Sequence, residues 1–308
     1  MLRKLLLICF SLATFGACAE ERINVYTRFP ANDPTAFVTA TLITELNKKL
    51  DEKYDFRLGT IPGSGGEAAD GKALAEAKLG TNTIVAGTIS NFTLNPIIYN
   101  STIDRDADFV PIELIALVPN AIMVSPDLKV DSLDQFVKYV KGKKEAFNGA
   151  TVQAVSPKLL DAIFRKQYDI NNVKMIQYKT PGEITKSVLS GEVDYSVQNP
   201  IDTPGLKLLA ISLPNRNSQY PNVPTGLELG IKDFNYASSL LLYAPKANAK
   251  FIDEIKKSVH EACASDAVRD VIAKLKLVFE CNNNEQFLRT EIARQKQLVK
   301  KYEDSIKQ

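Results

Sequence analysis

Residue types on which many catalytic and metal sites depend are scarce in this chain. It has no tryptophan, one histidine and four cysteines among 308 residues. No G-x-S-x-G, H-E-x-x-H, C-x-x-C or phosphate-loop pattern occurs. The histidine, His260, falls near the C-terminal end of an expected amphipathic helix, where a cation is favourable. We interpret it as a surface or capping residue, and we expect neither an enzyme nor a cofactor or bound metal.

An excess of charge of one sign is also absent. Lysine and arginine number 38, and aspartate and glutamate 36; removal of the first 19 residues takes away Arg3 and Lys4 and leaves 36 of each. A neutral chain without a basic run offers no electrostatic reason to bind nucleic acid or a membrane surface. Beyond residue 19, no segment is long and apolar enough to cross a bilayer.

Residues 1–19 have the pattern of a secretory signal peptide. A short basic start precedes an apolar run over 5–15, and an A-x-A cleavage pattern covers 17–19. This pattern predicts a periplasmic protein. Two alternatives stay open: a buried N-terminal helix, and lipidation at Cys18, which ends a lipobox-like Gly-Ala-Cys although Phe15 stands where that motif prefers leucine.

Two cysteines remain once the signal region, with Cys9 and Cys18, is set aside. In an oxidising compartment Cys263 and Cys281 are a candidate disulfide, which would close a loop from the end of one helix to the strand after the next. Two buried free thiols are the usual alternative, because the sequence does not fix the separation of the two Cα atoms.

Strand-like and helical patterns alternate along the rest of the chain, which predicts an α/β fold. The apolar segments 113–124 and 238–244 are each interpreted as a strand that leaves one sheet and enters another. Two such crossings imply two lobes with a hinge and a cleft between them. We assign residues 20–118 and 237–308 to the first lobe and residues 119–236 to the second.

The stretch 28–35 links an expected strand to the first strongly amphipathic helix. Asp33 can cap this helix with Pro34 at its first position, and a helix start favours an anion. The turns 61–67 and 90–93 also follow expected strands, and ligands collect at the carboxyl ends of strands in open α/β sheets. The alternative is that these residues form well-capped turns without a ligand.

The turn 61–67, with the start of the helix that follows it, superficially matches a dinucleotide-binding fingerprint through Gly63, Gly65 and Ala68. That motif also needs an acidic residue after the following strand to bind the ribose, and residues 89–91 include none. We therefore expect no nucleotide site.

The same turns resemble a known family, the periplasmic solute receptors of tripartite tricarboxylate transporters, also called Bug proteins. Phe29-Pro30 with Pro34-Thr35 resembles the family's opening P-F-P-P-G-G-P-T-D loop. Residues 62–66 resemble its second, glycine-rich turn, and 90–96 its S-N-G-T-x-x-x-N-P stretch. Residues 220–225 are similar to its L-P-D-V-P-T motif. The motifs follow one another in the family's order over nearly the full mature chain.

The resemblance implies a periplasmic binding protein-like fold of type II, with two α/β lobes joined by two crossing strands. It also implies a cleft that closes on a small organic solute, usually a carboxylate, and integral-membrane transporter subunits as partners. Backbone amides, small polar side chains and ordered water hold the carboxylate in this family. The positions that the resemblance places at the ligand are Asn32, Thr35, Ser64, Gly65, Ser90, Asn91, Ser156, Lys158, Tyr178, Thr180 and Asn199.

Departures from the family pattern bear on the ligand. Asn32 and Asp33 stand where the family has two glycines, so that a carboxylate faces the solute where the family offers bare backbone. Arg28 replaces a proline and can offset that charge or bind the ligand through its planar guanidinium. We add Arg28 and Asp33 to the candidate ligand-binding residues. Any of the candidates could instead cap a helix or satisfy a buried carbonyl.

We therefore predict a non-enzymatic periplasmic receptor that captures a small organic acid and delivers it to a tripartite tricarboxylate-type transporter. One alternative is a receptor that presents its closed form to a two-component sensor kinase. A neutral or cationic solute is a further alternative, because Asp33 would face it.

Overall fold

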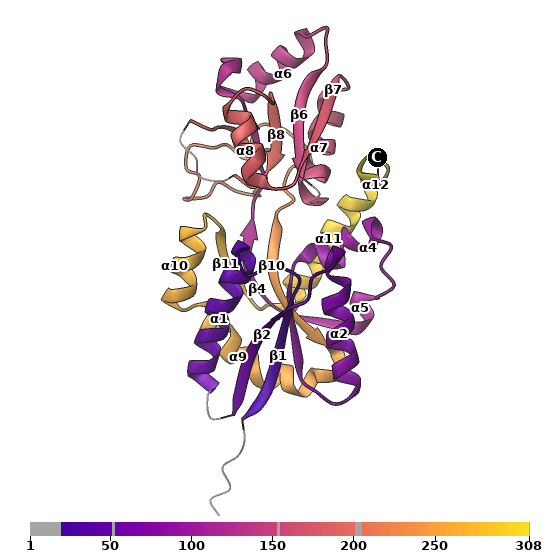
Figure 1. Ribbon diagram of the computed structural model, residues 1–308, viewed down its shortest axis with the longest axis vertical. Coiled ribbons are helices and arrows are strands. Elements are labelled where there is room, and N and C mark those ends of the chain that lie inside the picture. Colours follow the sequence, from indigo (N-terminus) through magenta and orange to yellow (C-terminus); the bar gives the residue numbers. More distant parts are fainter. Residues whose placement is uncertain (1–19, 51–52, 153–154, 201–204, 308) are drawn as a thin grey trace, which may run out of the picture.

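Two separate β-sheets organise the computed structural model, which describes residues 20–50, 53–152, 155–200 and 205–307 (Figure 1). The larger sheet has the strand order β11-β4-β10-β3-β1-β2 and the smaller one β7-β6-β8-β5-β9. We call each sheet with the helices packed on it a lobe, the larger being the first. This arrangement confirms the mixed α/β fold predicted from the sequence.

The bounds of the elements follow the chain in order. The strands are β1 Glu21–Thr27, β2 Tyr54–Thr60, β3 Thr83–Gly87, β4 Phe109–Val118, β5 Ala121–Val124, β6 Phe147–Val152, β7 Val173–Tyr178, β8 Tyr195–Gln198, β9 Lys207–Ile211, β10 Ser238–Pro245 and β11 Val278–Asn282. The longer helices are α1 Pro34–Leu50, α2 Glu67–Lys78, α6 Leu133–Gly142, α7 Val155–Tyr168, α8 Pro181–Leu189, α9 Ala249–Cys263, α10 Asp266–Lys274 and α11 Glu285–Lys301. The short ones are η1 Ser64–Gly66, α3 Ile89–Phe92, α4 Asn95–Ile98, α5 Arg105–Asp108, η2 Pro126–Leu128, η3 Lys246–Asn248 and α12 Glu303–Lys307.

Helices cover both faces of the first lobe's sheet. Strand β1 pairs in parallel with β2 and β3, and every residue of β3 is buried, as expected for a parallel strand covered on both sides. Apolar side chains of α1, α9 and α10 pack on one face with Ile23 and Ile84, whereas those of α2 and α11 pack on the other with Tyr26 and Val85. The alternation of side chains along the strands thus supplies two hydrophobic layers.

Two strands run from the first lobe toward the second. The segment 113–124 breaks at Pro119 and Asn120, so that β4 belongs to the larger sheet and β5 to the smaller, as the sequence predicted. The other crossing enters β10, which pairs antiparallel with β4 from Ser238↔Val118 to Pro245↔Phe109. The two lobes are therefore joined through a pair of neighbouring strands (Figure 1).

The C-terminal helices contact both lobes. Leu288 and Ile292 of α11 pack in the first lobe, whereas Tyr302 and Ile306 belong to the hydrophobic core around α6 and α7. Helix α12 contacts α7, and Figure 1 shows it beside the second lobe. Residues 298–306, assigned from the sequence to the first lobe, thus share a core with the second.

The expected signal peptide and the possible lipidation site at Cys18 lie outside the described residues. Within the part of the chain that is described, no helix combines the length and the apolar character needed to cross a membrane.

Candidate functional site

A pocket of about 400 Å³ lies between the two lobes. The first lobe contributes residues that follow β1 and β3, and the second contributes residues that follow β6, β7 and β8. Its volume falls in the usual range for sites that bind small molecules. The carboxyl ends of strands in both sheets therefore meet at one place, as expected for a ligand site in an α/β fold.

Three helices of eight or more residues begin at this pocket. Pro34 and Thr35 open α1, Ser156 and Pro157 lie in the first turn of α7, and Pro181 opens α8. Each helix start carries a partial positive charge and backbone N–H groups without a partner inside the helix. Their convergence makes the pocket favourable for a negatively charged group.

The start of α1 is capped as the sequence predicted. An Oδ1 atom of Asp33 accepts a hydrogen bond of 2.7 Å from the backbone N–H of Thr35, and Pro34 is the first helical residue. The carboxylate of Asp33 is therefore partly used by the helix, although the residue also lines the pocket. Its negative charge is offset there by two cations, Arg28 and Lys179, which line the same pocket.

Arg28 is the most unusual side chain of the pocket. It follows β1, and its guanidinium carbon lies 4.2 Å from the centre of the Phe29 ring. Its Nε atom is buried without a hydrogen-bond partner, and no ion pair to this guanidinium is found among the described residues. Burial lowers the pKa of Arg28, and the nearby Asp33 partly opposes that shift. Because an arginine stays charged at neutral pH, a largely desolvated cation without an ion-pair partner among the described residues faces the pocket.

Two other buried polar atoms of the pocket have no hydrogen-bond partner among the described residues. They are Nδ2 of Asn120, at the crossing between the lobes, and Oε1 of Gln198, at the end of β8. The Gln198 amide is held in place by hydrogen bonds from Nε2 to the Pro181 carbonyl, 3.1 Å, and to Oγ1 of Thr185, 3.3 Å. Buried polar groups are normally paired, so these atoms mark where polar groups of a ligand would bind.

Six of the candidate residues line this pocket: Arg28, Asp33, Thr35, Ser90, Ser156 and Asn199. Besides Asp33, which caps α1, two of them already have a protein partner. The Ser90 hydroxyl lies 2.9 Å from the Tyr236 hydroxyl, and Nδ2 of Asn199 donates to the Pro119 carbonyl over 2.9 Å. Arg28 and Asn120 are therefore freer to bind a ligand than Ser90 or Asn199.

Other candidates lie away from the pocket lining. Asn32 and Lys158 are exposed, and Lys158 borders a different hollow, beside α7. Tyr178 packs against the small core under α8, with its hydroxyl buried and without a partner in the described structure. Thr180 caps α8: its hydroxyl accepts from the Glu183 N–H, and the Glu183 side chain accepts from the Thr180 N–H.

The remaining candidates are Gly65, Asn91 and Ser64. Gly65 has φ 65°, and a Cβ there would lie 2.6 Å from the Tyr99 ring, so a side chain would clash. The Asn91 amide makes three hydrogen bonds within the protein: Nδ2 donates to Oη of Tyr243 over 2.7 Å, and Oδ1 accepts from Thr88 and Asn95. Ser64 is the first residue of the short helix η1.

Sequence reasoning missed several residues that line the pocket. They include Thr88, Asn95, Tyr99, Asn120, Lys179 and Gln198. The pairs Pro119-Asn120 and Gln198-Asn199 do stand out as polar breaks at the ends of apolar strands. However, nothing in the sequence says that these two breaks face Arg28, because the three segments are far apart along the chain.

A buried polar network lies beneath the pocket. Nε of Arg105 donates to Oδ2 of Asp70 over 2.6 Å, and Oη of Tyr243 donates to Oδ1 of Asp70 over 2.6 Å. Asn91 donates to the same Tyr243 hydroxyl. Burial raises the pKa of the Asp70 carboxyl, and the Arg105 charge opposes this shift. The network joins α2, α3, α5 and β10, and therefore fixes the floor on which Ser90 and Asn95 sit.

The capping role of Thr180 leads to a prediction. Thr180→Ala should lower the free energy of unfolding by about 1 kcal/mol, the usual cost of losing a hydroxyl cap. The affinity for a ligand should stay within about threefold, because the hydroxyl serves the helix and the residue does not line the pocket. Chemical denaturation and calorimetric titration check the two parts. A large loss of affinity at unchanged stability would instead make Thr180 a ligand-binding residue.

The chain is similar to known proteins over most of its length. The family described as "Tripartite tricarboxylate transporter family receptor" matches residues 60–303 of the chain. Protein BugT of Bordetella pertussis is 26% identical over 296 residues, which cover 89% of this chain and 88% of that protein.

Solved structures of similar fold include two with organic acids. MatC from Rhodopseudomonas palustris, with bound malate, superposes with a TM-score of 0.71 at 20% identity, over 90% of this chain and 99% of that one. A second protein of R. palustris, with adipate, gives a TM-score of 0.70 at 19% identity, over 92% and 97% of the two chains. At these identities the superpositions establish the fold, which is that of periplasmic binding proteins, as the sequence predicted.

Proposed function

The chain belongs to the tripartite tricarboxylate transporter receptor family, and from this premise we propose that it captures a small organic carboxylate in the pocket between its two lobes. The observation that carries the proposal is the guanidinium of Arg28, which faces the pocket without a hydrogen-bond or ion-pair partner among the described residues. Family and fold are those of solute-binding proteins, and we propose a binding role rather than a catalytic one.

The pocket has the chemistry to hold a carboxylate. A guanidinium can donate two parallel hydrogen bonds to one carboxylate, and such charge-assisted bonds are stronger than neutral ones. The starts of α1, α7 and α8 add partial positive charge and N–H donors. Ordered water can bridge the rest of the ligand to Asn120 and Gln198 at little cost.

The size of the solute follows from the pocket and from the relatives. Malate and adipate, seen in two proteins of this fold, are both short dicarboxylic acids. A pocket of about 400 Å³ has room for such an acid and bridging water. One carboxylate would bind Arg28 of the first lobe, and the other end would reach Asn120, Lys179 or Gln198 of the second.

Such a ligand would favour the closed arrangement of the lobes. It gains contacts from both lobes only when they are close together, and a ligand shifts a conformational equilibrium by its difference in affinity for the two states. We propose that the closed, loaded form is what an integral-membrane transporter subunit recognises in the periplasm. Co-purification of the loaded protein with permease subunits, and not with a sensor-kinase ectodomain, would support delivery over signalling.

A thermal-shift screen tests the proposed solute class. The mature protein should gain stability with a short dicarboxylate such as malate or adipate, because a ligand that binds only the folded state raises the free energy of unfolding. The gain is about 2.7 kcal/mol at a ligand concentration of 100 times Kd. The diamide of adipic acid, which has the same length and no charge, is the matched control and should leave the midpoint unmoved.

The opposite result would point to another solute. If every acid leaves the midpoint unchanged while an amine or a neutral compound raises it, the carboxylate proposal fails. Asp33, which lines the pocket, would then be the residue that binds the solute.

A further inference from the structure

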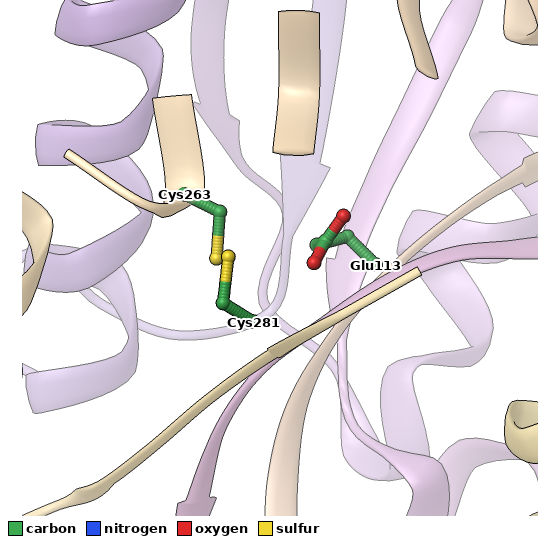
Figure 2. A group of neighbouring side chains, drawn as sticks. All are labelled: Glu113, Cys263 and Cys281. Carbon is green, nitrogen blue, oxygen red and sulfur yellow. The ribbon is translucent and has the colours of Figure 1, made fainter. Parts of the chain in front are cut away.

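Four side chains of the kinds that bind metal ions converge in the first lobe, under the edge strand of the sheet. Glu113 lies in β4, His260 and Cys263 in the last turns of α9, and Cys281 in β11. Figure 2 shows the two sulfur atoms facing each other and the Glu113 carboxylate pointing toward them. None of the four lines the pocket between the lobes.

The distances suit one shared ion. A carboxylate oxygen of Glu113 and the sulfur atoms of Cys263 and Cys281 all lie within 4.8 Å of one another. Nδ1 of His260 lies 3.2 Å and 3.3 Å from the two Glu113 oxygens and 3.8 Å from Sγ of Cys281. In a tetrahedral zinc site with metal–ligand bonds of about 2.0–2.3 Å, ligand atoms lie roughly 3.3–3.8 Å apart. His260 is not part of this close set of three, so its ring would have to shift toward Cys263 to complete the site.

The burial of Glu113 also calls for a cation. Its side chain is fully buried, and among the described residues both carboxylate oxygens are hydrogen-bonded to His260, which is partly exposed. A buried carboxylate is costly unless it is paired with a charge or coordinates a metal. A divalent ion between Glu113 and the sulfur atoms would supply that charge.

The backbone of β11 brings Cys281 to this position. Cys281 has φ 50°, in the left-handed region that residues other than glycine seldom adopt. The pairing of β11 with β4 shifts register between Phe279 and Asn282, around this residue. The strand thus departs from regular pairing at Cys281, whose sulfur atom lies beside that of Cys263.

We propose that Glu113, His260, Cys263 and Cys281 bind one divalent cation of the Zn²⁺ class. Two sulfur ligands, one imidazole and one carboxylate form a set that zinc accepts, whereas calcium and magnesium prefer oxygen ligands alone. Both thiols would bind as thiolates, so that binding releases two protons to solvent and needs no oxidant. The His260 side chain is 41% exposed. The ion would therefore enter the site from solvent past this imidazole.

Such an ion would hold the edge of the sheet together. Strand β11 pairs only with β4 among the described strands, and it is preceded by α10 and followed by α11. Four protein ligands leave no open position, which is typical of a structural rather than a catalytic zinc site. The ion would join α9, β4 and β11, three segments far apart in sequence, and would stabilise the folded chain.

A zinc titration of the mature, freshly reduced protein tests the proposal. We expect native mass spectrometry to find one Zn²⁺ per chain, and the thermal midpoint to rise with added Zn²⁺. Cobalt as a probe should give the charge-transfer absorption of thiolate ligands. His260→Gln and Cys281→Ser should each weaken binding at least about tenfold, because loss of a group that merely orients a ligand already costs about 10- to 100-fold.

The control is Lys257→Gln, on the same helix, whose side chain is 88% exposed and points to Glu261. It should bind zinc as the wild type does. The proposal is overturned if the reduced wild type takes up no zinc, or if His260→Gln and Cys281→Ser bind it as tightly as wild type. Because Cys263 is fully buried and its replacement can impair folding, the partly exposed His260 and Cys281 carry the test.

The same measurement addresses the disulfide predicted from the sequence. Cys263 and Cys281 are free thiols in this structure, with their sulfur atoms close together, and the disulfide stays a prediction. If the isolated protein is lighter than its reduced form by two hydrogens and the reduced form binds no zinc, the pair is a disulfide and the metal site is refuted. Zinc uptake by the reduced form that is lost on oxidation supports the site.

Discussion

Arg28→Ala should weaken binding of the organic acid by at least about 30-fold and leave the protein as stable as the wild type, or slightly more stable. The loss follows from removing one partner of a desolvated charge pair, which costs about 2–5 kcal/mol. In affinity this corresponds to about 30-fold to several thousand-fold. Isothermal titration calorimetry with the acid found in the thermal screen measures it.

The unchanged stability is the more specific part of this prediction. In most proteins removal of a half-buried arginine leaves a carboxylate unpaired, but Arg28 has neither an ion pair nor a hydrogen bond among the described residues. Its desolvation is a cost that the ligand would offset, and alanine removes that cost. A destabilised Arg28→Ala would instead show that the contact of the guanidinium with the Phe29 ring stabilises the fold by more than the desolvation costs.

Two further variants separate charge from geometry. Arg28→Lys keeps the positive charge and loses the planar pair of donors, so we expect an affinity between those of alanine and wild type. Lys179→Ala removes an exposed cation of the same pocket and should cost less, because exposed charges contribute about 0–1 kcal/mol. Equal losses at Arg28 and Lys179 would refute a special role for the buried guanidinium.

Asp70→Ala should destabilise the protein by about 3–5 kcal/mol, the cost of breaking a buried ion pair by removing one partner. Arg105 is 3% exposed and Asp70 fully buried, so the guanidinium has little access to water and keeps only Ser101, 2.8 Å away, and the longer 3.4 Å contact with Glu67. The Tyr243 hydroxyl loses its acceptor at the same time. Urea denaturation should show the loss, and the thermal midpoint should fall by on the order of 5–10 °C.

The control for this effect is a surface ion pair. Arg289→Ala breaks an exposed pair with Glu285 one helical turn away and should cost less than about 1 kcal/mol. The double variant Asp70→Ala with Arg105→Met should recover much of the stability, since an apolar replacement of both partners removes the unpaired charge. A double variant as unstable as Asp70→Ala alone would show that the loss comes from the Tyr243 hydroxyl or from a cavity.

The architecture could be predicted from the sequence more fully than the contacts that the polar side chains make. Alternating patterns, the break at Pro119 and the cap at Asp33 are local signals, and the structure agrees with each. Whether a polar side chain finds a hydrogen-bond partner depends on segments far away in the sequence. Asn91 and Arg28 both follow strands of one sheet, yet the Asn91 amide makes three hydrogen bonds within the protein, whereas the Arg28 guanidinium makes none with the described residues.

Long-range partners explain the other omissions. Gln198 and Asn120 face the pocket because β8 and β5 pair antiparallel, Ala121 opposite Gln198, and a single sequence carries no signal for that register. His260 fits its amphipathic helix as a surface residue, but it also contacts Glu113, 147 positions earlier in the chain. Contacts of this kind depend on the packing of whole elements.

The packing of the C-terminal helix against the second lobe has a mechanical consequence. Strands β4 and β10 lie side by side and act as one joint, and the contact between α12 and α7 lies apart from them (Figure 1). The lobes also touch near β11, where the Tyr220 hydroxyl donates to the Lys276 carbonyl over 2.8 Å. These two contacts beside the joint hold the second lobe in place, so we expect the pocket to open only when one of them separates, and a bulky residue at the helix contact to set how wide it can open.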